Sequence, residues 1–342
     1  MLVPPLQSRE GCWFGAGNLT RDASGAFYLV GRYRNAGDSR TGTTEGERGL
    51  ELAIFRSTDN AKNFSKIIAF TKADLAVGPH TVVSIEGAKL HFSAGGVELF
   101  VSTEKNGIEY PPGLESFRKP GTGIWTIDRL HAETVEDLKG KRPTTIMQGG
   151  DPQWLHAKDP VVFDTAAGDT LLVFCTHPFT WSSTSSARAV RPRGESSFSD
   201  PEYAFFPRGY TWDAAITRIT SFVRMPAGDR RAAGWVLVFY DGGESLRKQE
   251  EHPEAVRRPR GYSCEELGGT AVFNEGSGTI ERLSTALPAF VSPYGTGCSR
   301  YVDVLETEAG YYATWQQSQR DRSQPLVMSF LPRDQAERAF RS

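Results

Sequence analysis

Residues 156–178 read HAKDPVVFDTAAGDTLLVFCTHP: charged residues, an apolar run, a turn and a second apolar run. The apolar runs 161–163 and 170–176 are rich in β-branched and aromatic residues, so both predict β-strands. The segment 164–169 between them carries Asp and Gly and is typical of a tight turn. The stretch therefore predicts two antiparallel strands, with charged side chains at the entrance of the first.

The same order recurs along the chain: a first strand, a turn, an aromatic-rich second strand and a long polar stretch, in most units followed by a third strand. We place five such units at 15–67, 80–130, 158–208, 212–284 and 299–332. Repeats of this length built from up-and-down strands are typical of propeller blades. The sequence thus predicts an all-β fold, a five-bladed β-propeller that forms a single domain over residues 1–342. A two-sheet sandwich is the alternative.

Residues 1–7 are expected to close the ring by pairing with the last unit, which shows only three clear strands and would otherwise expose an edge. Helix is expected at two short segments, 132–138 and 334–340.

Four long connections leave the second strands of the first four units, at 33–48, 104–121, 178–208 and 242–266. In a propeller these connections emerge on the same face as the entrances to the first strands. Loops of this length in a compact domain usually form functional walls or lids. That face is the predicted site.

The composition of the chain limits the classes of partner that it is expected to bind. The chain has 39 basic and 41 acidic side chains and a net charge of −2, so no global field favours nucleic acid or an anionic membrane. No apolar run approaches the roughly 20 residues that span a bilayer. The first residues lack the pattern of a signal peptide, which predicts a cytoplasmic or an already processed protein. The four cysteines form no CxxC pair, and neither a metal site nor a cofactor is predicted.

The residues at the entrances of the five first strands are all polar, although the strands they open are apolar. They are Asn18, His80, Asp159, Asp213 and Arg300. Cleavage of a glycosidic bond needs one carboxylic acid as proton donor and one carboxylate as base or nucleophile. Asp159 and Asp213 are the predicted pair, with Lys158 or Arg300 holding Asp159 ionised. A solvated turn is the alternative for each aspartate.

A third carboxylate is expected from the end of the last long loop, where Glu265 or Glu266 would reach the pocket as general acid. The sequence leaves open which of the two faces inward, and an exposed ionic loop is the alternative. His177, at the end of a second strand, is a further substrate-binding candidate beside His80. Neither histidine lies in a metal-binding spacing such as HExxH.

Arginines suggest the charge of the substrate. Arg32 and Arg34 alternate with Tyr33, so both point to one side of a strand that ends at the predicted face. Together with Arg300 they would clamp a carboxylate or sulfate through bidentate hydrogen bonds. Salt bridges to acidic residues of the loop that follows (Asp38, Glu45, Glu47) are the alternative. Tyr301, next to Arg300, is also predicted to line the pocket.

Two motifs carry a family resemblance. Lys158–Phe163, KDPVVF, resembles the Asp-Pro-x-Val-Phe strand entrance of five-bladed glycoside hydrolases of family 43 and its relatives. The resemblance implies catalysis by two aspartates and a glutamate on separate blades. The first unit offers Asn18 where that family usually has its base aspartate, which indicates a divergent relative. Residues 57–64, STDNAKNF, resemble the Asp-box turn of sialidases and other propellers, which joins the outer strands of a blade and takes no part in catalysis.

These observations favour a glycosidase that acts on an oligosaccharide or polysaccharide, from a chain end because the channel is a closed funnel. A polysaccharide lyase is a second hypothesis, with Arg32, Arg34 and Arg300 neutralising a uronate and a histidine or Tyr301 as base. A propeller that only binds sugar or protein is the third.

Overall fold

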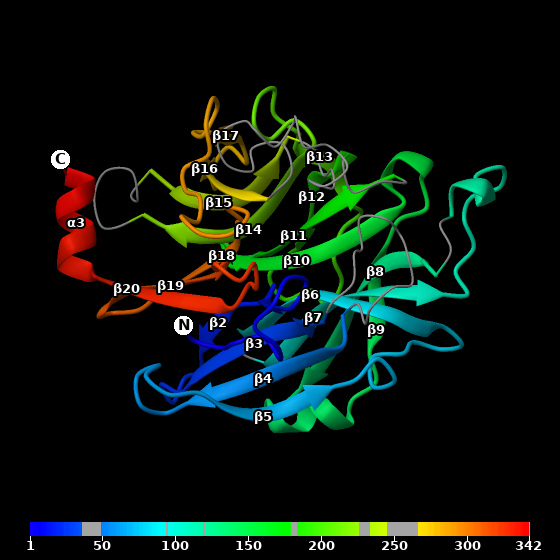
Figure 1. The fold of residues 1–342 in the computed structure, drawn as a ribbon, viewed down its shortest axis with the longest axis horizontal. Helices are drawn as coiled ribbons and strands as arrows, with labels where there is room; N and C mark the ends of the chain where they lie inside the picture. The colour runs from blue at the N-terminus through cyan, green and yellow to red at the C-terminus, as the bar shows by residue number, and fades with distance from the viewer. Residues whose placement is uncertain are drawn as a thin grey trace.

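The computed structural model describes residues 1–35, 49–93, 95–118, 121–178, 183–225, 233–244 and 266–341. Five separate antiparallel sheets follow one another in chain order around a common centre (Figure 1). The fold is a five-bladed β-propeller, which confirms the predicted class and rules out the two-sheet sandwich.

Each blade is built from consecutive strands, with the first innermost. The first blade contains β1 (Trp13–Gly15), β2 (Leu19–Arg21), β3 (Phe27–Arg34), β4 (Glu51–Ser57) and β5 (Ser65–Phe70). The second contains β6 (Thr81–Ser93), β7 (Gly96–Asn106), β8 (Ile124–Ala132) and β9 (Thr144–Gln148). The third contains β10 (His156–Asp164), β11 (Thr170–His177), β12 (Ser185–Arg191) and β13 (Glu202–Phe206). The fourth contains β14 (Ile216–Arg224), β15 (Trp235–Gly243), β16 (Leu267–Asn274) and β17 (Ile280–Arg282). The fifth contains β18 (Ser299–Glu306), β19 (Gly310–Gln317) and β20 (Leu326–Pro332).

The N-terminus closes the ring, as predicted. Val3 forms an antiparallel bridge with Leu326 at the start of β20. The Leu2 amide donates to the Leu326 carbonyl at 2.8 Å, and the Leu326 amide donates to the Val3 carbonyl at 3.0 Å. The first residues of the chain thus add a short fourth element to the three-stranded last blade.

The helices are short. The predicted segment 334–340 lies in α3 (Arg333–Arg341), at the edge of the last blade (Figure 1). The predicted segment 132–138 yields a 3-10 helix, η3 (Glu136–Gly140). Two further 3-10 turns are η2 (Glu115–Phe117) and η4 (Pro152–Trp154). Among the described residues, no helix has the length and hydropathy needed to span a membrane.

One predicted connection is wrong. The stretch 178–208 is not a single loop, because it contains β12 and β13. Its Ser- and Arg-rich sequence pairs residue by residue with β11, from Thr170 opposite Arg191 to Thr176 opposite Ser185. Arg191 is only partly buried and reaches Glu98 at 2.7 Å on the neighbouring blade. Arginine is compatible with this strand because a carboxylate lies opposite it.

The hydrophobic core lies between the faces of adjacent blades. Ile54 and Phe70 of the first blade belong to one buried cluster with Leu90 and Leu99 of the second. Since each blade is covered on both faces, its middle strands read as nearly continuous apolar runs. All eight residues of β11, for example, are buried.

The Asp-box-like segment forms a turn between β4 and β5, the position that the resemblance implies. Asp59 accepts hydrogen bonds from Ser57 Oγ at 2.7 Å and from the Asn63 amide at 3.0 Å. The bonds from Asn63 hold the pKa of Asp59 below its usual range. The turn stabilises the outer edge of the blade.

Candidate functional site at the propeller axis

The inner strands of all five blades meet at a cavity of about 20 Å³ on the propeller axis. Its walls include Ala16 between β1 and β2, Gly87 of β6, Asp159 of β10, Arg218 of β14 and Tyr301 of β18. A cavity of this size holds about one water molecule. The channel is therefore narrow at this depth, and a substrate would have to approach from one end.

The inner strands bend where they reach the axis. The register of β10 against β11 shifts between Lys158 and Val161, and Asp159 has φ 53°. Tyr301 in β18 and Ala16 in the first blade also have positive φ, 54° and 59°. A bulge re-aims the side chain at its position, and non-glycine residues adopt such φ values only where the surroundings enforce them. The bulges turn Asp159 and Tyr301 into the channel.

The position of Asp159 differs from the prediction. The residue was expected at the entrance of its strand, but β10 already begins at His156, which pairs with His177. Asp159 and Pro160 lie inside the strand, at the bulge. A bulge leaves one residue outside the ladder, so Pro160 fits there although it has no amide hydrogen to donate.

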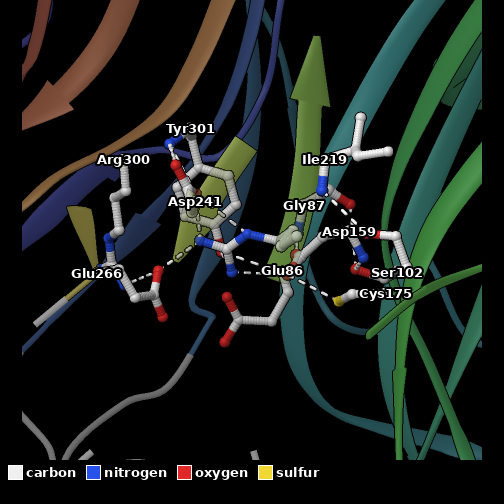
Figure 2. Close-up of polar contacts among 12 residues, drawn as sticks. Glu86, Gly87, Ser102, Asp159, Cys175, Ile219, Asp241, Glu266, Arg300 and Tyr301 are labelled. Atoms are coloured by element: carbon white, nitrogen blue, oxygen red, sulfur yellow. Dashed lines mark hydrogen bonds and ion pairs between the residues drawn. The ribbon is translucent and has the colours of Figure 1, made fainter. Parts of the chain in front are cut away.

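Three carboxylates converge on the buried guanidinium of Arg218. Its Nη1 lies 3.0 Å from Asp159 Oδ2, and its Nη2 lies 2.6 Å from Asp241 Oδ2 and also pairs with Glu266. Arg300 adds a second cation, 3.1 Å from Glu266. Figure 2 shows Glu266 and Arg300 on one side of this cluster and Asp159 on the other. We call these five residues the axial cluster.

The three acids of the axial cluster lie in different environments. Burial raises the pKa of Asp241 to about 6; Arg218 opposes this shift and the Glu266 carboxylate adds to it. Asp241 also accepts hydrogen bonds from the Tyr301 amide at 2.9 and 3.0 Å. Glu266 is ion-paired with both arginines. A carboxyl that titrates near neutral pH thus lies beside carboxylates that arginine holds.

Asp159 is fixed on every side. Its Oδ1 accepts the Gly87 amide at 3.0 Å, and its Oδ2 accepts the Tyr301 hydroxyl at 3.4 Å and the Cys175 thiol at 3.6 Å. Burial and the Asp159 carboxylate raise the pKa of Cys175 well above its usual value, which keeps it a thiol. The ion pair of Asp159 is formed with Arg218, a residue that the sequence interpretation did not single out.

A second charged group lies beside the axial cluster. Glu86 of β6 accepts two hydrogen bonds from Arg32, at 2.6 and 2.9 Å, and Arg34 is 3.9 Å away. Burial by itself would raise the pKa of Glu86, but Arg32 and Lys158 outweigh it and hold the pKa low. Both predicted arginines therefore lie at Glu86, beside the axial cluster. The loop acids considered as their alternative partners lie outside the described residues.

Trp13 of β1 is surrounded by guanidinium groups. The Cζ atoms of Arg300, Arg34 and Arg32 lie 4.2, 4.4 and 5.9 Å from the centre of its ring. Cation–π contacts hold all three arginines around one indole. This group connects the predicted arginine cluster with the axial cluster through Arg300.

Two predicted site residues have partners outside the axial cluster. The Asn18 side chain donates to the Leu90 carbonyl at 3.0 Å and accepts the Leu90 amide at 2.8 Å, so it joins the first blade to the second. Asp213 is fully buried and contacts Tyr240 at 3.0 Å and Arg282 at 2.7 Å, on the outer side of the fourth blade. Burial raises its pKa. The ion-pair partner of Asp213 is thus Arg282, which is not part of the axial cluster.

Some of the remaining predicted residues belong to the axial cluster or contact it, and others lie elsewhere. Glu266, Arg300 and Tyr301 lie in or against the axial cluster, whereas Glu265 lies outside the described residues. His80 lies in the turn before β6, against Gly107. His177 is buried and stacks on His156, with ring centres 4.5 Å apart. Among the described residues, no group of three or more His, Cys, Asp and Glu side chains is arranged to hold a metal ion.

The sequence interpretation missed Glu86, Arg218, Asp241 and Trp13. The first three share a signal: each is a single charge inside an apolar strand, in SIEGA, AITRI and VFYDGG. An isolated charge at such a place is costly to bury unless it is paired. Three of them, in three predicted strands, would have indicated a common buried site.

Neither protein-family models nor curated proteins match this chain. Solved structures do match its fold. A thermostable family-43 glycoside hydrolase superposes with a TM-score of 0.60 at 10% identity, over 96% of this chain and 92% of that one. An α-L-arabinofuranosidase from Lactobacillus brevis gives 0.59 at 10% identity, over 94% and 90%. An endo-arabinase from Bacteroides thetaiotaomicron gives 0.56 at 12% identity, over 97% of each chain. The similarity establishes a common fold.

Proposed function

We propose that the protein is a glycoside hydrolase that cleaves a glycosidic bond with the carboxyl groups of the axial cluster. The observation that carries the proposal is the convergence of Asp159, Asp241 and Glu266 at the axis, one of them with a pKa of about 6. Glycosidic cleavage needs a proton donor and an ionised carboxylate in one site. The fold shared with family-43 hydrolases agrees with this chemistry.

The environments suggest the roles. Asp241 is the proton donor, since its raised pKa keeps it partly protonated near neutral pH. Glu266 is the base or nucleophile: it is paired with Arg218 and Arg300 and, at 5% exposure, is the least buried of the three acids. Asp159 holds Arg218 in place and takes part in the charge balance of the site.

The proposal includes an oligosaccharide substrate that carries an acidic sugar and is cleaved from a chain end. Two structural neighbours were solved with xylotriose, which agrees with an oligosaccharide. Arg32, Arg34 and Arg300 support an acidic sugar, because they gather around Trp13 beside the carboxylates. The narrow axial cavity supports entry from one side.

The test is a screen of neutral and acidic plant, algal and bacterial glycans, read as reducing sugar and as ultraviolet absorbance. Reducing ends without absorbance are expected. An unsaturated product that absorbs in the ultraviolet would show that the reaction is elimination and not hydrolysis. Burial raises the pKa of Tyr301 well above its usual value, which opposes Tyr301 as the base of a lyase.

Variants of each acid then test the mechanism. Asp241→Asn and Glu266→Gln are each expected to lower kcat by roughly 10²–10⁴-fold, the usual contribution of a positioned acid or base. Asp159→Asn is expected to lower kcat as well, because it removes the charge that holds Arg218. Glu202→Gln is the matched control, because Glu202 pairs with Arg188 on an outer strand. Circular dichroism establishes that each variant is folded. If all three variants kept near-normal turnover, or if sugars bound and were never cleaved, the protein would be a binding propeller.

A further inference from the structure

Two buried hydrogen-bond donors beside the axial cluster have no partner in the described part of the chain. They are Nη1 of Arg32 and Nε1 of Trp13. Arg32 is 1% exposed, so its charged group is not solvated in the usual way. Folded proteins pair nearly all such donors, and a charged donor is the most costly to leave unpaired. Two of them close together indicate a place for an acceptor that the described chain does not supply.

The strand register places both donors on one side of the first blade. Trp13 lies opposite Arg34 and Gly15 lies opposite Arg32, so these side chains share a face of the sheet. Gly15 contributes no side chain here, and the Gln316 side chain packs against it, with its Oε1 2.8 Å from where a Cβ would lie. Trp13 is only partly buried, whereas both arginines are buried.

One edge of the Arg32 guanidinium is already bound to Glu86. Its Nε and Nη2 both donate to Glu86 Oε2, which fixes the group and leaves Nη1 for another acceptor. Arg34 and Arg300 lie over the same indole. An acceptor at these two donors would therefore lie among three guanidinium groups, where an anionic oxygen is favoured over a neutral one.

We infer that Trp13 and Arg32 form a subsite that receives an anionic substituent of the sugar, a carboxylate or a sulfate. The indole N–H and the guanidinium Nη1 donate to its oxygens, and Glu86 positions Arg32. The identification of the ligand as a sugar rests on the proposed hydrolase, whereas the anion subsite rests on the two donors.

Binding is measured first, without catalysis. Calorimetric titration compares D-glucuronate, D-glucose 6-sulfate and D-glucose on the full chain. At least one of the two anions is expected to bind about tenfold or more tightly than glucose, with an affinity that falls as salt is raised. The two anionic sugars distinguish a carboxylate from a sulfate. Equal affinity for all three sugars would overturn the inference.

Variants locate the subsite. Trp13→Phe keeps the ring under the arginines but removes the N–H, and it is expected to weaken anion binding about tenfold while glucose binding is unchanged. Trp235→Phe is the control for the loss of an indole. Trp235 lies at the start of β15, at the opposite end of that strand from Asp241. Arg32→Lys keeps the charge next to Glu86 but loses the forked geometry, so it provides a second variant that is expected to fold. Unchanged preference for the anion in both variants would refute the assignment.

Kinetics separates this inference from the proposed function. If the enzyme cleaves acidic oligosaccharides, Trp13→Phe is expected to raise their KM and to leave kcat nearly unchanged, because the subsite binds and does not react. Cleavage of neutral glycans with no preference for acidic ones would refute the anion subsite and support the hydrolase. Binding of glucuronate without cleavage of any glycan would support the anion subsite and refute the hydrolase.

Discussion

Asp159 and Arg218 belong to different blades and form an ion pair at 3.0 Å on the propeller axis. Asp159 is aimed there by the bulge in β10, and Arg218 lies in β14. The same guanidinium binds Asp241 and Glu266 of the fourth blade. One arginine therefore neutralises the acids proposed for catalysis and also connects the third blade to the fourth. Stability and chemistry depend on the same side chain.

Replacement of Arg218 is expected to be severely destabilising. Arg218→Met has a similar volume but leaves three buried carboxylates with one fewer cation, so the free energy of unfolding should fall by about 3–5 kcal/mol. Urea unfolding measures the change. Arg56→Gln is the control, since Arg56 and Glu136 form an exposed pair worth less than about 1 kcal/mol. A loss no greater than that of the control would show that the axial cluster contributes little to stability.

Gly87→Ala is expected to displace Asp159. A Cβ on Gly87 would lie 2.6 Å from Asp159 Oδ1 and 2.9 Å from its Cα, so backbone as well as side chain would have to move. We expect a stability loss of about 1–3 kcal/mol, as for other overpacked sites, together with lower turnover. The matched control is Gly140→Ala, where the new Cβ meets nothing within 4 Å. Equal behaviour of the two variants in unfolding and activity assays would contradict this expectation.

His91 makes stability depend on pH. Burial by itself would lower its pKa, but hydrogen bonds to Asp164 at 2.9 Å and Glu98 at 3.3 Å raise it to about 9. A folded-state pKa above the unfolded value stabilises the protein fully below pH 6.5, and this contribution is lost between pH 6.5 and 9. The shift from 6.5 to about 9, at about 1.4 kcal/mol per pKa unit, makes this contribution on the order of 3 kcal/mol.

The measurement is the unfolding free energy of the wild type and of His91→Gln at several pH values. The difference between them should shrink as the pH rises from 6.5 to 9. Arg191 and Arg129 also pair with Glu98, at 2.7 and 3.4 Å, and keep their charge throughout this range. A difference that stays constant with pH would show that His91 is not protonated in the folded protein.

Val3 is expected to matter for closure of the ring. Val3 is 4% exposed and packs in the cluster that contains Phe14 and Leu326. Val3→Asp places an unpaired charge there and should cost about 2–4 kcal/mol, through lost apolar burial and desolvation. The same substitution at Leu6, which is 54% exposed, should be nearly neutral. Thermal unfolding of the two variants decides, and a similar Tm for both would argue against closure by Val3.

The fold was accessible from sequence because strand patterns and turns repeat in a fixed order, as in residues 156–178. Element boundaries were less accessible: the polar stretch after β11 looks like a loop, but it pairs with β11 along its length and its arginines find carboxylates at Glu202 and Glu98. Arg32, Glu266 and Arg300 were placed at the channel because the strand ends that carry them converge in any propeller.

Other site residues depend on details that a single strand does not reveal. Asn18 and Asp213 were assigned by their distance from a strand, yet the path of the chain turns their side chains toward Leu90 and Arg282. Arg218 and Asp241 lie within strands that look like ordinary core. Their charges are tolerated because both are paired: Arg218 binds Asp241 within the fourth blade and Asp159 of the third blade. The pairing between blades is a property of the assembled ring.

The contact between Val3 and Leu326 also constrains the order of folding. The two residues are separated by almost the whole chain, so closing this loop carries a large entropic cost and a high contact order. During synthesis the contact cannot form until Leu326 has left the ribosome. The first four blades can pair their strands earlier, before Val3 can contact Leu326. The last blade is thus completed by a segment that precedes the first blade in the sequence, and the contact between Val3 and Leu326 closes the propeller only after both segments have been made.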